Sequence, residues 1–148
     1  MEKTPIIAAF CGTGKTHTCQ RSSGRLIEFE CWKYSNRSGF PHSIVKHIIS
    51  KCGTVDGIFI STNPVVLDAL PSKMNVTLIY PDLSLKDEYI SRFVGRDSPD
   101  DFISMLSKYW EPWIVEAMAQ PIERHIVLKS GKYVESVLPK LLTTNCKE

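Results

Sequence analysis

Five short apolar runs divide the sequence, and stretches with helical periodicity lie between them. Short apolar runs that alternate with helices are typical of a parallel sheet whose strands are joined by crossover helices. We therefore expect an α/β protein with a doubly wound, five-stranded parallel sheet and flanking helices. The runs are PIIAAF (5–10), RLIEFE (25–30), VDGIFIS (55–61), NVTLIY (75–80) and RHIVLK (124–129).

Two segments on either side of the third run carry helix signals. In PHSIVKHIISKCG, isoleucine and valine recur at helical spacing between Pro41, which favours a helix start, and Gly53, which favours a stop. NPVVLDAL, at 63–70, predicts a short helix that Pro71 ends. Both segments fit crossover helices of the expected sheet.

A longer helix is predicted after the fourth run. Ser98 is the expected N-cap and Pro99 the first helical residue, with two acidic residues in the first turn. Pro112 lacks an amide hydrogen, so it should bend or divide this helix. An apolar stripe at spacings of three and four predicts a core-facing surface. The stripe consists of Phe102, Met105, Leu106, Tyr109, Trp110 and Trp113.

Size and composition are those of an ordinary folded domain. A chain of 148 residues has a common single-domain size, so we expect one domain over 1–148. No stretch is apolar enough for a membrane span, and a net charge of +2 without a basic block gives no strong nucleic-acid signal. The 5 cysteines form no CxxC pair, which favours reduced thiols and a cytoplasmic location.

A glycine-rich loop directly follows the first apolar run. Residues 9–16 read AFCGTGKT, the phosphate-loop pattern with alanine in its first position. In this pattern successive main-chain amides surround nucleotide phosphates, and Gly12 and Gly14 let the backbone come close. Lys15 reaches the outer phosphate oxygens, and the Thr16 hydroxyl helps to coordinate Mg²⁺. The sequence therefore predicts a loop that binds ATP and Mg²⁺.

The remaining loop residues are assigned to the same nucleotide contact. The predicted binding segment also includes Cys11 before the glycines, Thr13 between them and His17 after Thr16. We interpret Cys11 as a small space-filling side chain rather than a reactive thiol. The alternative is an unrelated glycine-rich turn with Lys15 solvated at a helix start, but the preceding strand and the following helix favour the phosphate loop.

A charged segment at about 84–98 is the candidate lid. If it is helical, Tyr89, Arg92 and Arg96 share one face, so the two guanidinium groups can grip neighbouring phosphates. We therefore assign Arg92 and Arg96 a catalytic role beside Lys15. The alternative is an exposed helix whose arginines pair with Asp87, Glu88 or water.

The end of the second run is the candidate site for the phosphate acceptor. Glu28 and Glu30 alternate around Phe29, which predicts one strand face for both carboxylates at the carboxyl edge, where open α/β sheets bind ligands. One of them can orient an acceptor hydroxyl, although both are also consistent with solvated positions on an edge strand. Trp32 could stack on a base, but we expect it in the core.

The third and fifth runs complete the predicted site. The third run ends in Ser61 rather than in the aspartate that many phosphate-loop proteins place there, and Asp56 at its start is interpreted as a turn residue. Magnesium binding is thus left to Thr16, the substrate phosphates and a second-strand carboxylate. After the fifth run, Ser130 and Gly131 predict a tight turn against the adenine. None of the four histidines has metal-ligand spacing.

With these motifs in place, the chain resembles the small phosphate-loop nucleotide kinases of the nucleoside monophosphate (adenylate) kinase type, above all short members encoded by bacteriophages and prophages. The likeness implies the phosphate-loop kinase fold, ATP as donor, Mg²⁺ as cofactor, a nucleotide acceptor, and Arg92 and Arg96 as lid cations. Such proteins carry an aspartate-rich D-L-E-S motif in the second strand, where this chain has EFEC at 28–31. The likeness runs through AAFCGTGKTH, LIEFECWKY, GIFISTNPVVLDAL, TLIYPDLSLKDEYISRF and IVLKSGKYVESVL.

The expected function is therefore ATP-dependent phosphoryl transfer to a nucleoside or deoxynucleoside monophosphate, in the host cytoplasm if the chain is phage-encoded. The alternative is an ATP-binding regulator or inactive kinase relative that docks on a protein partner through the aromatic surface at 110–113. A third interpretation, phosphorylation of polynucleotide 5′ ends, needs a basic groove that the near-neutral charge does not indicate. The acceptor stays open, as does a homodimer.

Overall fold

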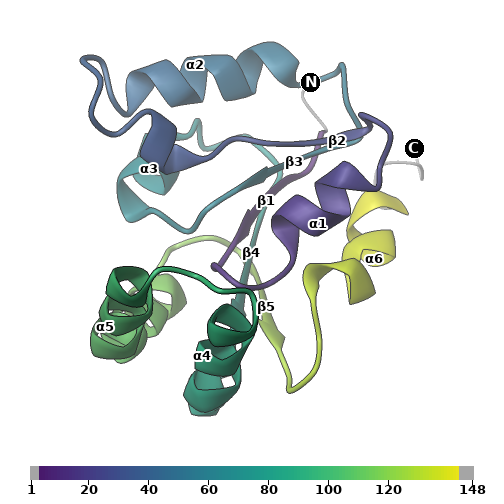
Figure 1. The fold of residues 1–148 in the computed structure, drawn as a ribbon. Helices are drawn as coiled ribbons and strands as arrows, with labels where there is room; N and C mark the ends of the chain where they lie inside the picture. Colours follow the sequence, from purple (N-terminus) through teal and green to yellow (C-terminus); the bar gives the residue numbers. More distant parts are fainter. Residues whose placement is uncertain (1–3, 144–148) are drawn as a thin grey trace.

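A computed structural model describes residues 4–143 as an α/β protein with one all-parallel sheet (Figure 1). Within these residues, five strands lie in the order β2-β3-β1-β4-β5. Each strand falls inside the apolar run that predicts it, apart from β4, which continues one residue past its run to Pro81, so all five predicted strands are confirmed. They are β1 (Ile6–Ala9), β2 (Leu26–Glu28), β3 (Gly57–Ile60), β4 (Val76–Pro81) and β5 (Arg124–Leu128).

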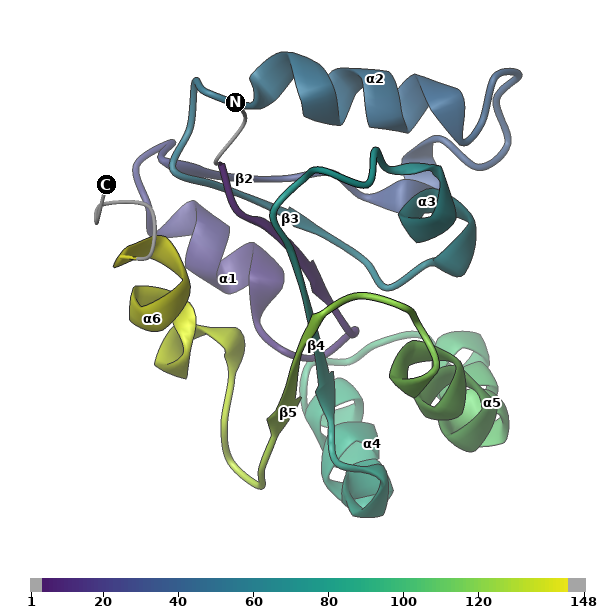
Figure 2. The ribbon, with the colours of Figure 1, turned by 180° about the vertical axis from the view of Figure 1, so that it is seen from behind.

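The segments between the strands fold into helices that cover both faces of the sheet, the arrangement of a doubly wound fold (Figures 1 and 2). The helices are α1 (Lys15–Gln20), α2 (His42–Lys51), α3 (Pro64–Ala69), α4 (Lys86–Gly95), α5 (Asp100–Met118) and α6 (Leu138–Thr143). Short 3-10 turns span Cys31–Lys33, Leu83–Leu85 and Val134–Ser136. None of the helices in the described part of the chain combines the length and the hydropathy needed to cross a bilayer.

Side chains alternate along β1 between two hydrophobic cores. Ile6 and Ala8 pack among residues of α2, α3, α4 and α5, whereas Ile7 and Ala9 pack among residues that include those of α6. All four side chains are fully buried, as expected for a parallel strand with helices on both sides. The central strand is therefore enclosed on every side.

The strand order reverses beside β1. This strand pairs with β3 on one side and β4 on the other, and the chain fills the β3 and β2 side before it crosses to β4 and β5. Open α/β sheets bind ligands outside the carboxyl ends of the strands at such a switch point. The loop at 9–16, hereafter the glycine loop, leaves the carboxyl end of β1 and so lies at this position.

The long helix differs from its prediction at its start. Helix α5 begins at Asp100 with Pro99 as its N-cap, so Ser98 is not the cap. It also continues through Pro112, which does not divide it. Proline removes one amide donor and crowds the preceding turn, and tertiary packing of the helix outweighs that local cost.

The apolar stripe of α5 is only partly a core surface. Leu106 and Trp110 are buried, but Met105 is 44% exposed and Tyr109 is 38% exposed. The buried stripe continues instead through Ile114 and Ala117. Both sets of residues have helical spacing, so the spacing alone did not determine which one faces the sheet.

Candidate functional site

Left-handed backbone at two glycines shapes the glycine loop. Gly12 has a φ of 80° and Gly14 a φ of 92°, values that side chains disfavour. Between them, Thr13 is fully buried and its hydroxyl donates to the carbonyl oxygen of Phe10 at 2.6 Å. The loop therefore has a defined, internally bonded conformation.

The main-chain amides at the end of the loop are not used by the fold. Within residues 4–143, no hydrogen bond engages the N–H groups of Gly14, Lys15 and Thr16. The first bond of α1 is donated by Thr18 to the carbonyl oxygen of Gly14, at 3.0 Å. Consecutive amides without acceptors form the kind of backbone surface that binds anions.

Lys15 folds back across the glycine loop. Its Nζ donates to the carbonyl oxygen of Ala9 at 2.8 Å, so the side chain closes the loop on its own first residue. Burial lowers the pKa of Lys15, while the neighbouring Glu28 and Glu30 carboxylates act in the opposite direction. The structure thus keeps the ammonium group at the loop and close to both acidic residues of the second run.

The thiol in the loop has a raised pKa. Burial raises the pKa of Cys11 to about 11, although the charges of Lys15 and Arg96 act to lower it. Near neutral pH this thiol is protonated, and the thiolate is the form that reacts. These properties support the interpretation of Cys11 as a space-filling residue.

Thr16 and Glu28 meet at the carboxyl edge of the sheet. The Thr16 hydroxyl donates to Oε1 of Glu28 at 2.7 Å. Hydroxyl and carboxylate oxygens are ligands that suit Mg²⁺. Residues 4–143 contain no cluster of three or more histidine, cysteine or acidic side chains suited to a metal. The pair therefore fits a magnesium ion that takes its remaining ligands from phosphates and water.

Glu30 does not share a strand face with Glu28, contrary to the sequence prediction. Strand β2 ends at Glu28, and Glu30 caps the 3-10 turn that follows. Its carboxylate accepts a hydrogen bond from Nε1 of Trp32 at 2.7 Å and lies 3.7 Å from the Lys33 ammonium group. Trp32 was expected in the core but is 69% exposed, so this turn presents an indole ring to solvent.

Helix α4 holds the two candidate lid arginines in different surroundings. Tyr89 and Phe93 anchor the helix in the core, with exposures of 0% and 2%. The Arg92 side chain is 11% exposed and pairs with Glu88 at 2.9 Å, as the alternative interpretation expected. Arg96 lies just beyond the helix end, is exposed, and places its guanidinium over the Phe93 ring at 4.5 Å. The closure of 84–98 as a lid stays a prediction.

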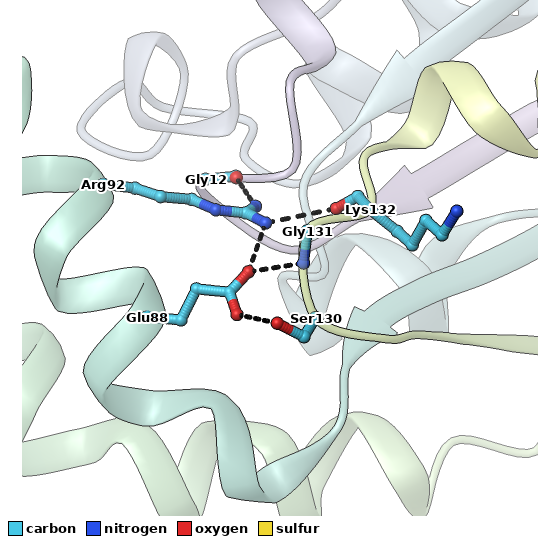
Figure 3. A network of polar contacts seen from close by, with 6 residues as sticks. All are labelled: Gly12, Glu88, Arg92, Ser130, Gly131 and Lys132. Carbon is cyan, nitrogen blue, oxygen red and sulfur yellow. Dashed lines mark hydrogen bonds and ion pairs between the residues drawn. The ribbon is translucent and has the colours of Figure 1, made fainter.

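A polar network joins α4 to the turn after β5 (Figure 3). The Glu88 carboxylate accepts from the Ser130 hydroxyl at 2.6 Å and from the Gly131 amide at 2.8 Å. Gly131 has a φ of 75°, which fits the predicted tight turn. From the sequence, Glu88 was expected only as an ion-pair partner, and its spacing of four residues from Arg92 was the available signal.

The surroundings of three further residues bear on the roles that the sequence suggested for them. Asp56 precedes β3 at the amino edge of the sheet, 3.7 Å from the Arg25 guanidinium, which supports its interpretation as a turn residue. Ser61, after β3, donates to Sγ of Cys31 at 3.0 Å. Trp110 is 2% exposed and donates from Nε1 to the Leu83 carbonyl, so it cannot anchor a surface partner as the regulator hypothesis proposed.

One cavity lies away from the glycine loop. A cavity of about 890 Å³ is bordered by residues after α3, by Val76 at the start of β4, and by Arg124 at the start of β5. It is therefore at the amino edge of the sheet, opposite the loop. Ligands of open α/β sheets bind at the other edge, so we place the candidate site at the glycine loop.

Comparison with known proteins gives no significant match, either to a protein-family model or to a curated sequence. A function for this protein is therefore inferred from the geometry of the site.

Proposed function

We propose that this protein is a phosphate-loop nucleotide kinase that transfers the γ-phosphoryl group of ATP to a nucleoside or deoxynucleoside monophosphate. One observation carries the proposal. The glycine loop leaves a central, buried strand at the switch point of a parallel sheet, with unpaired amides at Gly14, Lys15 and Thr16. That combination of position and free donors suits a polyphosphate.

The loop residues would stabilise the negative charge of the phosphate oxygens and would not react covalently with them. Phosphoryl transfer depends mainly on positioning and on electrostatic stabilisation of the phosphate oxygens. The free amides would contact the inner phosphates of ATP. Lys15 would give up its hydrogen bond to the Ala9 carbonyl oxygen and contact the outer phosphate oxygens instead. Thr16 and Glu28 would hold Mg²⁺, which neutralises charge on the phosphates.

The acceptor would bind beside β2. The carboxylate of Glu28 ends that strand, and Glu30 and the exposed ring of Trp32 follow within four residues. A carboxylate can accept a hydrogen bond from a ribose hydroxyl, and an exposed indole can stack on a base. Arg96, which is exposed near the loop residue Cys11, would complete the site as the cation of the closing segment.

A panel of nucleoside monophosphates tests the proposal. Each is incubated with ATP and Mg²⁺, and formation of ADP and of the phosphorylated acceptor is measured. Lys15→Ala should lower the rate at least about a hundredfold, because it removes the cation that stabilises the outer phosphate oxygens. Lys46→Ala, which removes an exposed lysine on α2, should leave the rate unchanged.

Three outcomes separate the hypotheses. ADP formation that requires one acceptor supports a kinase. ATP binding without any turnover would point to the regulator or inactive relative, and phosphorylation of polynucleotide ends but not of monophosphates would point to the third interpretation. Wild-type protein that binds neither ATP nor polyphosphate would contradict the proposal as a whole.

A further inference from the structure

The Arg92 guanidinium is enclosed between two tyrosine rings. It lies 4.1 Å from the centroid of the Tyr89 ring and 4.0 Å from that of Tyr133. Aromatic faces attract cations, and the attraction increases where water is excluded. The side chain is 11% exposed, so neither face of the guanidinium is open to an incoming phosphate.

The N–H groups of Arg92 are also engaged by the protein (Figure 3). Nη1 donates to the carbonyl oxygen of Gly12 at 2.7 Å. Nη2 donates to the Glu88 carboxylate at 2.9 Å and to the Lys132 carbonyl at 3.2 Å. One guanidinium thus bonds to the glycine loop, to α4 and to the turn at 130–132.

Glu88, the partner of Arg92 in the ion pair, also bonds to the turn at 130–132. It accepts hydrogen bonds from Ser130 and Gly131, and these bonds, together with Arg92, hold the pKa of its carboxyl group below the ordinary value. Near neutral pH the carboxylate is therefore charged and can accept hydrogen bonds from Arg92 and from the turn at the same time. Every bond drawn in Figure 3 has Glu88 or Arg92 as one of its partners.

The rings around Arg92 also contact the glycines of the loop. A Cβ added at Gly12 would lie 3.0 Å from ring atoms of Tyr89 and Phe93, and one at Gly14 would lie 3.2 Å from the Tyr133 ring. In addition, the Val134 amide donates to the Thr13 carbonyl oxygen at 2.9 Å. The turn, α4 and the glycine loop therefore form one packed unit centred on Arg92.

From this geometry we infer that Glu88 and Arg92 are a positioning pair, which fixes the glycine loop and the 130–132 turn relative to each other so that one ATP contacts both. The inference rests on the proposed function and changes one assignment within it. Arg92 acts through the Gly12 carbonyl and does not touch phosphate, whereas Arg96 is the lid cation. Neither side chain of the pair is a catalytic residue in this scheme.

The test compares ATP with inorganic tripolyphosphate, which can contact the loop but has no base for the turn. Dissociation constants are measured by calorimetry for wild type, Glu88→Gln, Arg92→Lys and the double variant. Each single variant should weaken ATP binding about tenfold, and the double variant should do no more, because both changes break one unit. Asp87→Asn removes an exposed charge from the same helical turn and should change neither constant.

The ratio of the two constants separates positioning from loss of fold. In Glu88→Gln the turn is released while the loop keeps Lys15, so the preference for ATP over tripolyphosphate should fall about fivefold or more. Partial unfolding would weaken the binding of both ligands equally and leave the ratio of their dissociation constants unchanged. The Gly131 amide should also exchange its hydrogen faster in both single variants, and this measurement needs no ligand.

Several results would overturn the inference. Multiplicative losses in the double variant, or an unchanged preference for ATP in Glu88→Gln, would show that the pair does not act as a unit. If Arg92→Lys weakened the binding of ATP and of tripolyphosphate equally while Glu88→Gln had no effect, Arg92 would be a phosphate contact instead. If wild type bound neither ligand, the proposed function would fail as well. Binding by wild type with unaffected variants would reject the positioning role alone.

Discussion

The glycine loop has two flanks that hold it very differently. On the α4 side, Arg92 bonds to the Gly12 carbonyl, and the rings of Tyr89 and Tyr133 lie against the loop glycines. On the β2 side, the polar side-chain contact to the loop is the bond from Thr16 to Glu28, and the neighbouring Trp32 is 69% exposed. In our proposal the first flank binds the donor nucleotide and the second binds the acceptor.

This contrast indicates which flank of the proposed site can vary its ligand and which cannot. On the donor flank, Tyr89 and Phe93 belong to the core, so a change at either residue disturbs the packing of α4. On the acceptor flank, Trp32 and Lys33 are exposed on a 3-10 turn, so these two residues can change without cost to the core. We infer that the polyphosphate site is fixed by the fold, whereas a few exposed residues select the acceptor.

The largest expected effect comes from the donor flank. Gly12→Ala adds a methyl group 3.0 Å from Tyr89 and Phe93 at a φ of 80°, so the loop must move. We expect ATP affinity to fall about a hundredfold or more and stability to fall by about 1–3 kcal/mol, measured by calorimetry and thermal unfolding. Gly24→Ala is the matched control, because its φ is 85° with nothing within 4 Å. Equal ATP affinities in the two variants would show that the close contact at Gly12 does not cause the loss of binding.

An intermediate effect is expected at the acceptor flank. Glu28→Gln keeps the hydrogen-bond acceptor for Thr16 but removes the negative charge. The Mg²⁺ concentration for half-maximal rate should rise about 10- to 100-fold, measured by magnesium titration of the kinase reaction. Glu123→Gln, at the opposite edge of the sheet, is the control. If the magnesium dependence of Glu28→Gln matched that of wild type, this carboxylate would have no role in holding the metal.

The smallest expected effect separates Arg96 from Arg92. Arg96→Ala should lower kcat about tenfold and change ATP affinity less than about threefold, because a closing cation acts mainly in the transition state. Steady-state kinetics and calorimetry give the two quantities. Arg25→Ala removes an exposed arginine at the amino edge and serves as control. Unchanged turnover in Arg96→Ala would end the lid assignment.

The sequence predicted those parts of the molecule that depend on local patterns. Short apolar runs bounded by polar or turn residues determined the five strands, and a motif with fixed spacing located the glycine loop. The end of β2 was missed because polar and apolar residues continue to alternate through Glu30 after the strand has stopped. Alternation describes a possible strand face but contains no information on where pairing ends.

Long-range packing accounts for what the sequence could not predict. Helical spacing placed Met105 and Tyr109 on the same apolar stripe as the buried Trp110, and only the docking of α5 on the sheet determines which of these side chains are exposed. In the same way, Arg92 lies 80 residues from Gly12, and no local rule links a helix residue to a particular loop carbonyl. Arginines on helices usually face solvent, so the enclosed guanidinium emerged only from the tertiary structure.

The fully buried β1 strand has a practical consequence. Because β1 is hydrogen-bonded on both sides and has no exposed side chain, it can separate from its neighbours only when the whole sheet melts. A compound that binds the attached loop in the native state alone therefore raises the melting temperature of the entire chain. Saturation at a hundred times the dissociation constant contributes about 2.7 kcal/mol. A simple thermal screen of nucleotides can thus rank ligands before any assay of turnover is available.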